Sequence, residues 1–98
     1  MRTIPLTAIP NQRLTVTINN ARWELTIKQA RGMMVCDVMR DDTYLIRGTR
    51  IVANAPIIPS HYLSNNGNFA ILTENDELPR WEKFESNQTL VYWRDGYD

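Results

Sequence analysis

Apolar and polar residues alternate strictly through residues 13–28, on both sides of the pair Asn19-Asn20. Strict alternation is typical of a β-strand with one buried face, and an Asn-Asn pair tolerates the positive φ values of a two-residue hairpin turn. With the turn at this pair, Val16 lies opposite Trp23, and a shift of one residue would place every apolar side chain opposite a polar one. The pattern therefore predicts a β-hairpin of defined register with one wet face. The other apolar pairs expected are Ile18 with Ala21 and Leu14 with Leu25.

A third strand is predicted at residues 33–39, after a turn centred on Ala30-Arg31. That turn would place apolar residues opposite apolar residues again, which favours a three-stranded antiparallel meander. The pairs expected are Met34 with Ile27, Cys36 with Leu25 and Val38 with Trp23.

The rest of the chain reads as short strands separated by turns and loops. About seven short strands predict an all-β fold, either a small antiparallel β-sandwich or a partly open barrel, in one domain spanning residues 1–98. Pro5 and Pro10 fix φ and lack amide donors, so residues 1–12 are expected to form an extended, proline-containing N-terminal arm or edge strand. Further strands are expected at 43–46, 50–53, 69–73 and 89–94, with a bulge or bend at Gly48, a proline-rich connector at 54–59, a loop at 64–68 and a helical turn at 79–84.

The chain has 98 residues, 43% of them hydrophobic, which suits one globular domain. The formal net charge is zero, but residues 1–50 hold eight basic and four acidic side chains, whereas residues 51–98 hold three basic and seven acidic ones. This asymmetry has two interpretations. It can reflect two solvated faces, or one end of the protein can complement the other end of a neighbouring copy. No apolar run approaches the ~20 residues of a membrane helix, and we expect a soluble protein without a signal peptide.

Candidate chemistry is sparse. Cys36 is the single cysteine, so no intrachain disulfide is possible, and a solitary cysteine in a β pattern is expected to be a small buried hydrophobe. His61 is the single histidine and is expected at the surface or in a packing role rather than as a general base. The acidic pairs and clusters fall at predicted turns, where Asp is common for backbone reasons and an apolar cleft is missing. These are Asp41-Asp42 and Glu74, Asp76 and Glu77.

We therefore predict that the protein is not an enzyme, and we assign no catalytic, cofactor-binding or metal-binding residues and no cofactor. The triplet Asn87-Gln88-Thr89 matches the glycosylation pattern, but nothing in the chain indicates secretion and we treat the match as chance.

Aromatic residues beside cations suggest a second class, a small nucleic-acid-binding barrel of the OB type. Trp23 lies on the apolar face of its predicted strand, which favours a role in the core. A chain of zero net charge also lacks the basic surface that nucleic-acid-binding proteins present. Nucleic acid is therefore not expected as a partner. The candidate pairs are Trp23 with Arg22, Tyr44 with Arg47 and Trp93 with Arg94.

The order of motifs along the chain resembles that of the baseplate plug proteins of contractile-tailed phages. The resemblance lies in Ile4-Pro5-Leu6, Ile9-Pro10-Asn11-Gln12, Trp23-x-Leu25, Leu45-Ile46-x-Gly48-x-x-Ile51-Val52 and the closing strand Leu90-Val91-Tyr92. Two turns depart from the pattern, because Asn19-Asn20 and Ala53-Asn54-Ala55 stand where glycine is usual. Both departures concern loops only.

The resemblance implies a structural component of the tail baseplate that binds the hub and neighbouring baseplate or tail proteins, without catalysis. It implies several symmetry-related copies in the virion. The lack of a signal peptide and of a membrane span adds the expectation of synthesis in the host cytoplasm and of no membrane as partner. A proline-rich arm and separated charge suit this function, since extended segments add strands to the sheet edges of partners.

Overall fold

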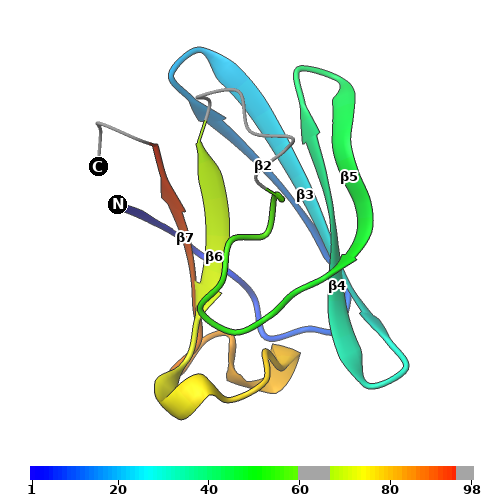
Figure 1. The fold of residues 1–98 in the computed structure, drawn as a ribbon, viewed down its shortest axis with the longest axis vertical. Coiled ribbons are helices and arrows are strands. Elements are labelled where there is room, and N and C mark those ends of the chain that lie inside the picture. Colours follow the sequence, from blue (N-terminus) through cyan, green and yellow to red (C-terminus); the bar gives the residue numbers. More distant parts are fainter. Residues whose placement is uncertain (60–66, 95–98) are drawn as a thin grey trace.

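The computed structural model describes residues 1–59 and 67–94. In this part of the chain, seven strands form two antiparallel sheets that face each other without closing into a barrel, which confirms the predicted all-β, sandwich-like fold (Figure 1). One sheet has the order β1-β7-β6 and the other the order β2-β3-β4-β5. The strands are β1 (Arg2–Ile4), β2 (Gln12–Ile18), β3 (Ala21–Ala30), β4 (Met33–Arg40), β5 (Thr43–Arg50), β6 (Asn68–Leu72) and β7 (Thr89–Trp93).

The hairpin β2–β3 has the predicted register. Val16 lies opposite Trp23, and Ile18 lies opposite Ala21 beside the turn. Asn19 and Asn20 both have positive φ, 52° and 66°, as a type I′ turn requires.

The predicted register of β3 and β4 is wrong by two residues. Cys36 lies opposite Ile27 and Val38 opposite Leu25, so the turn is formed by Arg31 and Gly32, both at positive φ, instead of Ala30-Arg31. A shift of two residues keeps every side chain on its face, so the alternation of apolar residues could not detect it.

Strand β5 differs in length from the prediction but confirms the bulge at Gly48. The β4–β5 register shifts between Cys36 and Val38 and again between Val38 and Met39. The amide of Gly48 donates to Asp37 Oδ1 at 2.6 Å, and its φ is 63°. The separate strand predicted at 50–53 is wrong, because β5 continues to Arg50 and residues 51–53 are not a strand.

The connector 54–59 runs along the free edge of β6 and is irregular, as predicted. The amides of Asn54 and Ile57 donate to the carbonyls of Ile71 and Phe69, 2.9 and 2.8 Å away. The buried Asn68 side chain forms two hydrogen bonds with the connector: it donates to the Ile58 carbonyl and accepts from the Ile58 amide.

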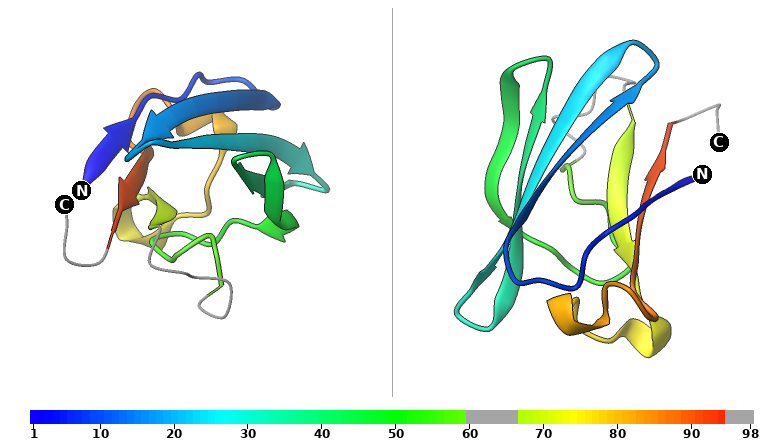
Figure 2. Two further views of the ribbon diagram at one scale, coloured as in Figure 1. Left: turned by 90° about the horizontal axis from the view of Figure 1, so that it is seen from above. Right: turned by 180° about the vertical axis from the view of Figure 1, so that it is seen from behind.

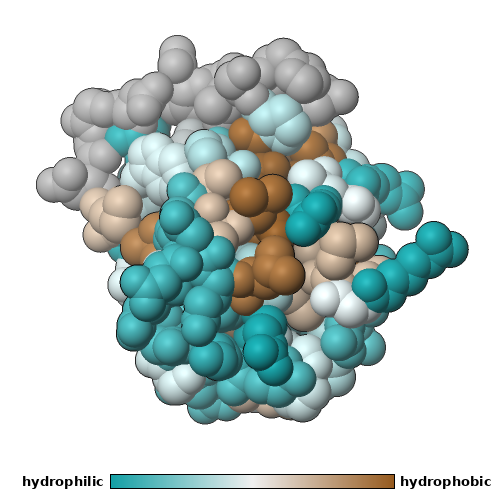
Figure 3. All heavy atoms as spheres, turned by 60° about the horizontal axis from the view of Figure 1, so that its bottom comes forward, coloured by the Kyte–Doolittle hydropathy of each residue, from teal (hydrophilic) through white to brown (hydrophobic). Residues whose placement is uncertain are grey.

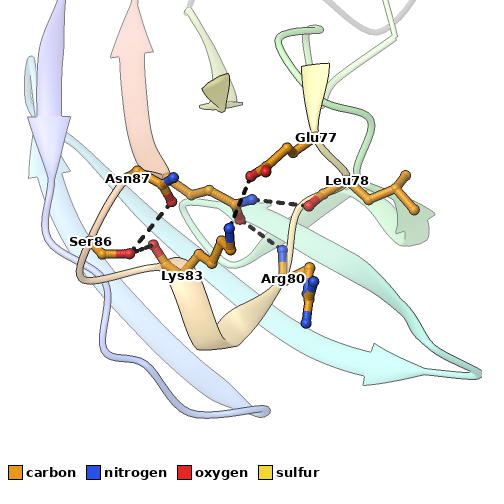
Figure 4. Close-up of polar contacts among 7 residues, drawn as sticks. Glu77, Leu78, Arg80, Lys83, Ser86 and Asn87 are labelled. Carbon is orange, nitrogen blue, oxygen red and sulfur yellow. Dashed lines mark hydrogen bonds and ion pairs between the residues drawn. The ribbon is translucent and has the colours of Figure 1, made fainter. Parts of the chain in front are cut away.

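The end of the molecule between β6 and β7 is built from two short 3-10 helices, η2 (Glu74–Asp76) and η3 (Trp81–Lys83). The second falls inside the helical turn predicted at 79–84. Gln88 is 1% exposed and holds this segment together. Its Oε1 accepts from the Arg80 amide at 2.7 Å and its Nε2 donates to the Leu78 carbonyl at 3.0 Å (Figure 4).

The core lies between the two sheets. Trp23 and Leu25, which the alternation places inside, are 1% and 0% exposed. Leu14 and Val16 on β2 are half-buried against the same cluster. The other buried members include Ile27, Val38, Phe69, Ile71, Leu90 and Tyr92.

The N-terminal residues lie against the body of the protein. β1 pairs with β7, with Thr3 opposite Val91, and Ile4 and Leu6 belong to the core. Residues 5–11 link β1 to β2. Figure 2 shows the two strands diverging from this link.

Candidate interaction surfaces

The outer face of the strands β6 and β7 is largely apolar. Phe69 and Ile71 point into the core, so Ala70 and Leu72 point outward on β6. On β7, Val91 and Trp93 take the same outward side. Both strands are therefore apolar on two faces, which is typical of strands covered on both sides rather than of strands with a wet face.

A hollow of about 390 Å³ lies on this outer face. Four of the residues around it are exposed, among them Met1 at 62% and Leu72 at 37%. Ala70 and Val91 at its floor are nearly inaccessible to solvent, at 3% and 2%. Its lining residues are Met1, Asn54, Pro56, Ala70, Leu72, Val91 and Trp93. An exposed apolar concavity of this kind is typical of a contact site for another molecule.

The four strands of the sheet β2-β3-β4-β5, with their connecting turns, carry a net positive charge. Residues 12–50 hold seven basic and four acidic side chains, a net charge of +3. Lys28 pairs with Asp37 at 3.4 Å, and Arg22 pairs with Asp42. The Arg47 guanidinium lies 4.4 Å from the centre of the Tyr44 ring.

The opposite charge gathers at the end that carries η2 and η3. Residues 74–85 hold five acidic and two basic side chains, a net charge of −3. Figure 3 turns this end forward and shows hydrophobic residues in the middle of the view, with hydrophilic residues to the left, to the right and below. The net positive charge of residues 12–50 and the net negative charge of residues 74–85 therefore belong to different parts of the fold.

The aromatic residues proposed for nucleic-acid stacking do not share a surface. Trp23 is in the core, where Arg40 lies 5.7 Å from its ring centre, and Trp93 lines the hollow on the three-stranded sheet. Tyr44, 42% exposed, is the one member of this set that is exposed on the four-stranded sheet. Stacking platforms for single strands need successive aromatic side chains.

The acidic residues at turns make hydrogen bonds and ion pairs with other parts of the chain. Asp41 Oδ1 accepts from the Arg22 amide at 2.8 Å, and Asp76 Oδ1 accepts from Asn54 Nδ2 at 2.8 Å. Glu77 pairs with Lys83 Nζ at 3.3 Å. Across residues 1–59 and 67–94, no three His, Cys, Asp or Glu side chains come together in an arrangement that could hold a metal ion.

Cys36 lies fully buried in the core, as the sequence predicted. Burial, with a smaller contribution from the negative charge of Asp37, raises the pKa of its thiol to about 12. A thiol in such surroundings is inert, because the thiolate is the reactive form. His61 lies outside the described residues.

The sequence matches a known family over residues 1–96, nearly its whole length. The family is described as the cyanophage baseplate Pam3 plug gp18. The chain belongs to this family. No curated protein matches it.

Membership confirms the resemblance to the baseplate plug proteins of phages and gives the chain a structural function in the virion tail. The described part of this baseplate plug protein holds no helix of the length and apolarity needed to cross a membrane. Its most prominent surface features are the apolar hollow, the net positive charge of the four-stranded sheet and the acidic end.

Sequence reasoning missed the hollow and the two buried amides, Asn68 and Gln88. The continuous apolar runs 69–72 and 90–93 were a usable signal, since a strand with one wet face would alternate. The amides gave no signal, because only the folded chain brings the groups that they bind within reach.

Proposed function

We propose that the protein is a non-catalytic component of the baseplate that binds the hub and neighbouring tail proteins through the outer face of the sheet β1-β7-β6. The observation that carries this proposal is the apolar hollow, in which the exposed side chains of Met1 and Leu72 lie beside the nearly buried Ala70 and Val91. Removing apolar surface from water contributes about 25 cal/mol for each Å², and this contribution offsets the entropy that association costs.

The separation of charge supports placement in several symmetry-related copies. The end with η2 and η3 is acidic and the four-stranded sheet is basic, so contacts between unlike surfaces of neighbouring copies are electrostatically favourable. Synthesis in the host cytoplasm, with no membrane and no nucleic acid as partner, completes this proposal.

The experiment is to complement a phage lacking this protein with variants of it and to measure their occupancy in purified tails. Leu72→Glu places a charge in the hollow and is expected to lower occupancy severalfold without unfolding the isolated protein. Leu78→Glu is the matched control, since Leu78 is 57% exposed and does not line the hollow. Normal occupancy of the Leu72→Glu protein would refute the docking face.

A further inference from the structure

The outer edge of β2 is the longest regular sheet edge left open in the described part of the chain. β2 pairs with β3 on one side, and within residues 1–59 and 67–94 no strand pairs with the other. The other edges are protected. β5 is broken by two register shifts, β1 has three residues, and the connector 54–59 covers β6. Bulges, short strands and covering segments are the usual protection of sheet edges.

The hairpin geometry identifies which backbone groups face outward. Ile18 and Ala21 flank the two-residue turn and therefore form a hydrogen-bonded pair, and such pairs recur at every second residue. The intervening residues direct their backbone N–H and C=O away from β3. These residues are Arg13, Thr15 and Thr17, all exposed.

The side chains beside this edge are incompletely covered. Leu14 and Val16 point toward the core but remain half-buried, whereas Leu25 and Trp23, opposite them on β3, are almost fully buried. A strand added beside β2 would place its inward side chains next to Leu14 and Val16 and remove them from water.

The charge of the sheet indicates the chemistry of that strand. Its outward side chains would lie beside Arg13, on a sheet whose net charge is +3. A second copy of β2 would bring a second basic sheet to this edge, so an acidic strand is favoured. We propose that β2 accepts an extended segment of a neighbouring protein in which apolar residues alternate with acidic ones.

The probe is a peptide of about six residues that alternates valine and glutamate, capped at both ends, with lysine replacing glutamate in the control peptide. Hydrogen exchange on the unaltered full chain should show new protection of the amides of Arg13, Thr15 and Thr17. The glutamate peptide should bind more tightly than the lysine peptide, and added salt should reduce that difference.

Two variants test the backbone contact. Thr15→Pro removes one outward N–H without removing a bond to β3 and should weaken binding about tenfold, whereas Thr15→Val keeps the N–H and the branched shape and should bind normally. If Thr15→Pro fails to fold, hydrogen exchange on the unaltered chain still shows whether the peptide binds at the edge of β2.

Three outcomes would overturn the proposal. The first is protection on β5 or on the three-stranded sheet in place of β2. The second is equal binding to the Thr15→Pro and Thr15→Val proteins. The third is protection of these β2 amides that rises with protein concentration without peptide, since the occupant would then be a second copy. None of these readouts depends on Leu72, so this test and that of the docking face fail independently.

Discussion

The indole of Trp23 meets the ring of Phe69 edge to face, with ring centroids 5.1 Å apart and an angle of 75° between the ring planes. Trp23 comes from β3 and Phe69 from β6, so this contact joins the two sheets at the centre of the core. Tyr92 on β7 completes the group, with its ring 6.0 Å from Trp23 and 5.2 Å from Phe69.

Removing the indole should strongly destabilise the fold. Trp23→Ala is expected to lower the free energy of unfolding by about 3–5 kcal/mol, because it leaves a cavity where the two sheets meet. Urea unfolding followed by circular dichroism measures this. Thr17→Ala on the exposed face should change stability by less than about 0.5 kcal/mol, and a loss below about 1 kcal/mol for Trp23→Ala would contradict the packing described.

Gln88 should be essential to the segment that carries η3. Gln88→Leu keeps the volume but leaves the Arg80 amide and the Leu78 carbonyl without their partner, which is expected to cost about 2–4 kcal/mol. Chemical denaturation gives the value, with Asn87→Ala as the neighbouring control. Equal stability of the two variants would show that the buried amide contributes nothing.

Two glycines at positive φ should respond differently to alanine. Gly48→Ala is expected to cost about 1–2 kcal/mol, the cost of the left-handed backbone, since nothing lies within 4 Å of the added methyl group. Gly67→Ala should cost more, because its methyl group would lie 2.5 Å from the Tyr92 ring. Thermal unfolding compares them, and the reverse order would contradict the close approach of Gly67 to Tyr92.

The thiol of Cys36 should make stability depend on pH in the alkaline range. Its pKa rises from an ordinary value of 9.0 to about 12 in the folded protein. The unfolded chain therefore loses this proton first, and the contribution is complete below about pH 9 and is lost as pH rises toward 12. Unfolding of Cys36→Ala, measured alongside, should show a smaller fall in stability between these values. Parallel pH profiles for the two proteins would contradict a buried, neutral thiol.

The same burial predicts slow chemical modification. An aromatic disulfide reagent at neutral pH should react with Cys36 only as fast as the protein unfolds. Rapid reaction in the absence of denaturant would place the thiol at the surface.

The local sequence pattern was sufficient to predict the N-terminal hairpin and its register. Asn19-Asn20 provides the turn conformation, and the alternation around it leaves one register in which Val16 meets Trp23. Both pieces of information lie within about ten residues of each other, so no distant part of the chain was needed. The same alternation could not distinguish registers two residues apart, so only the folded protein showed that the next turn is centred on Arg31-Gly32 rather than on Ala30-Arg31.

The sequence by itself determined the β class, the first hairpin, the core positions of Trp23 and Leu25, and the baseplate plug family. Only the tertiary structure decided that Arg2–Ile4 pairs with the last strand, that Asn68 and Gln88 are buried, and that Leu72 borders an apolar hollow. The physical reason is distance along the chain. The periodicity of apolar residues shows which side of a strand each residue faces. The pairing of the first strand with the last, and the surroundings of the outer face of a sheet, depend on segments that meet only after folding.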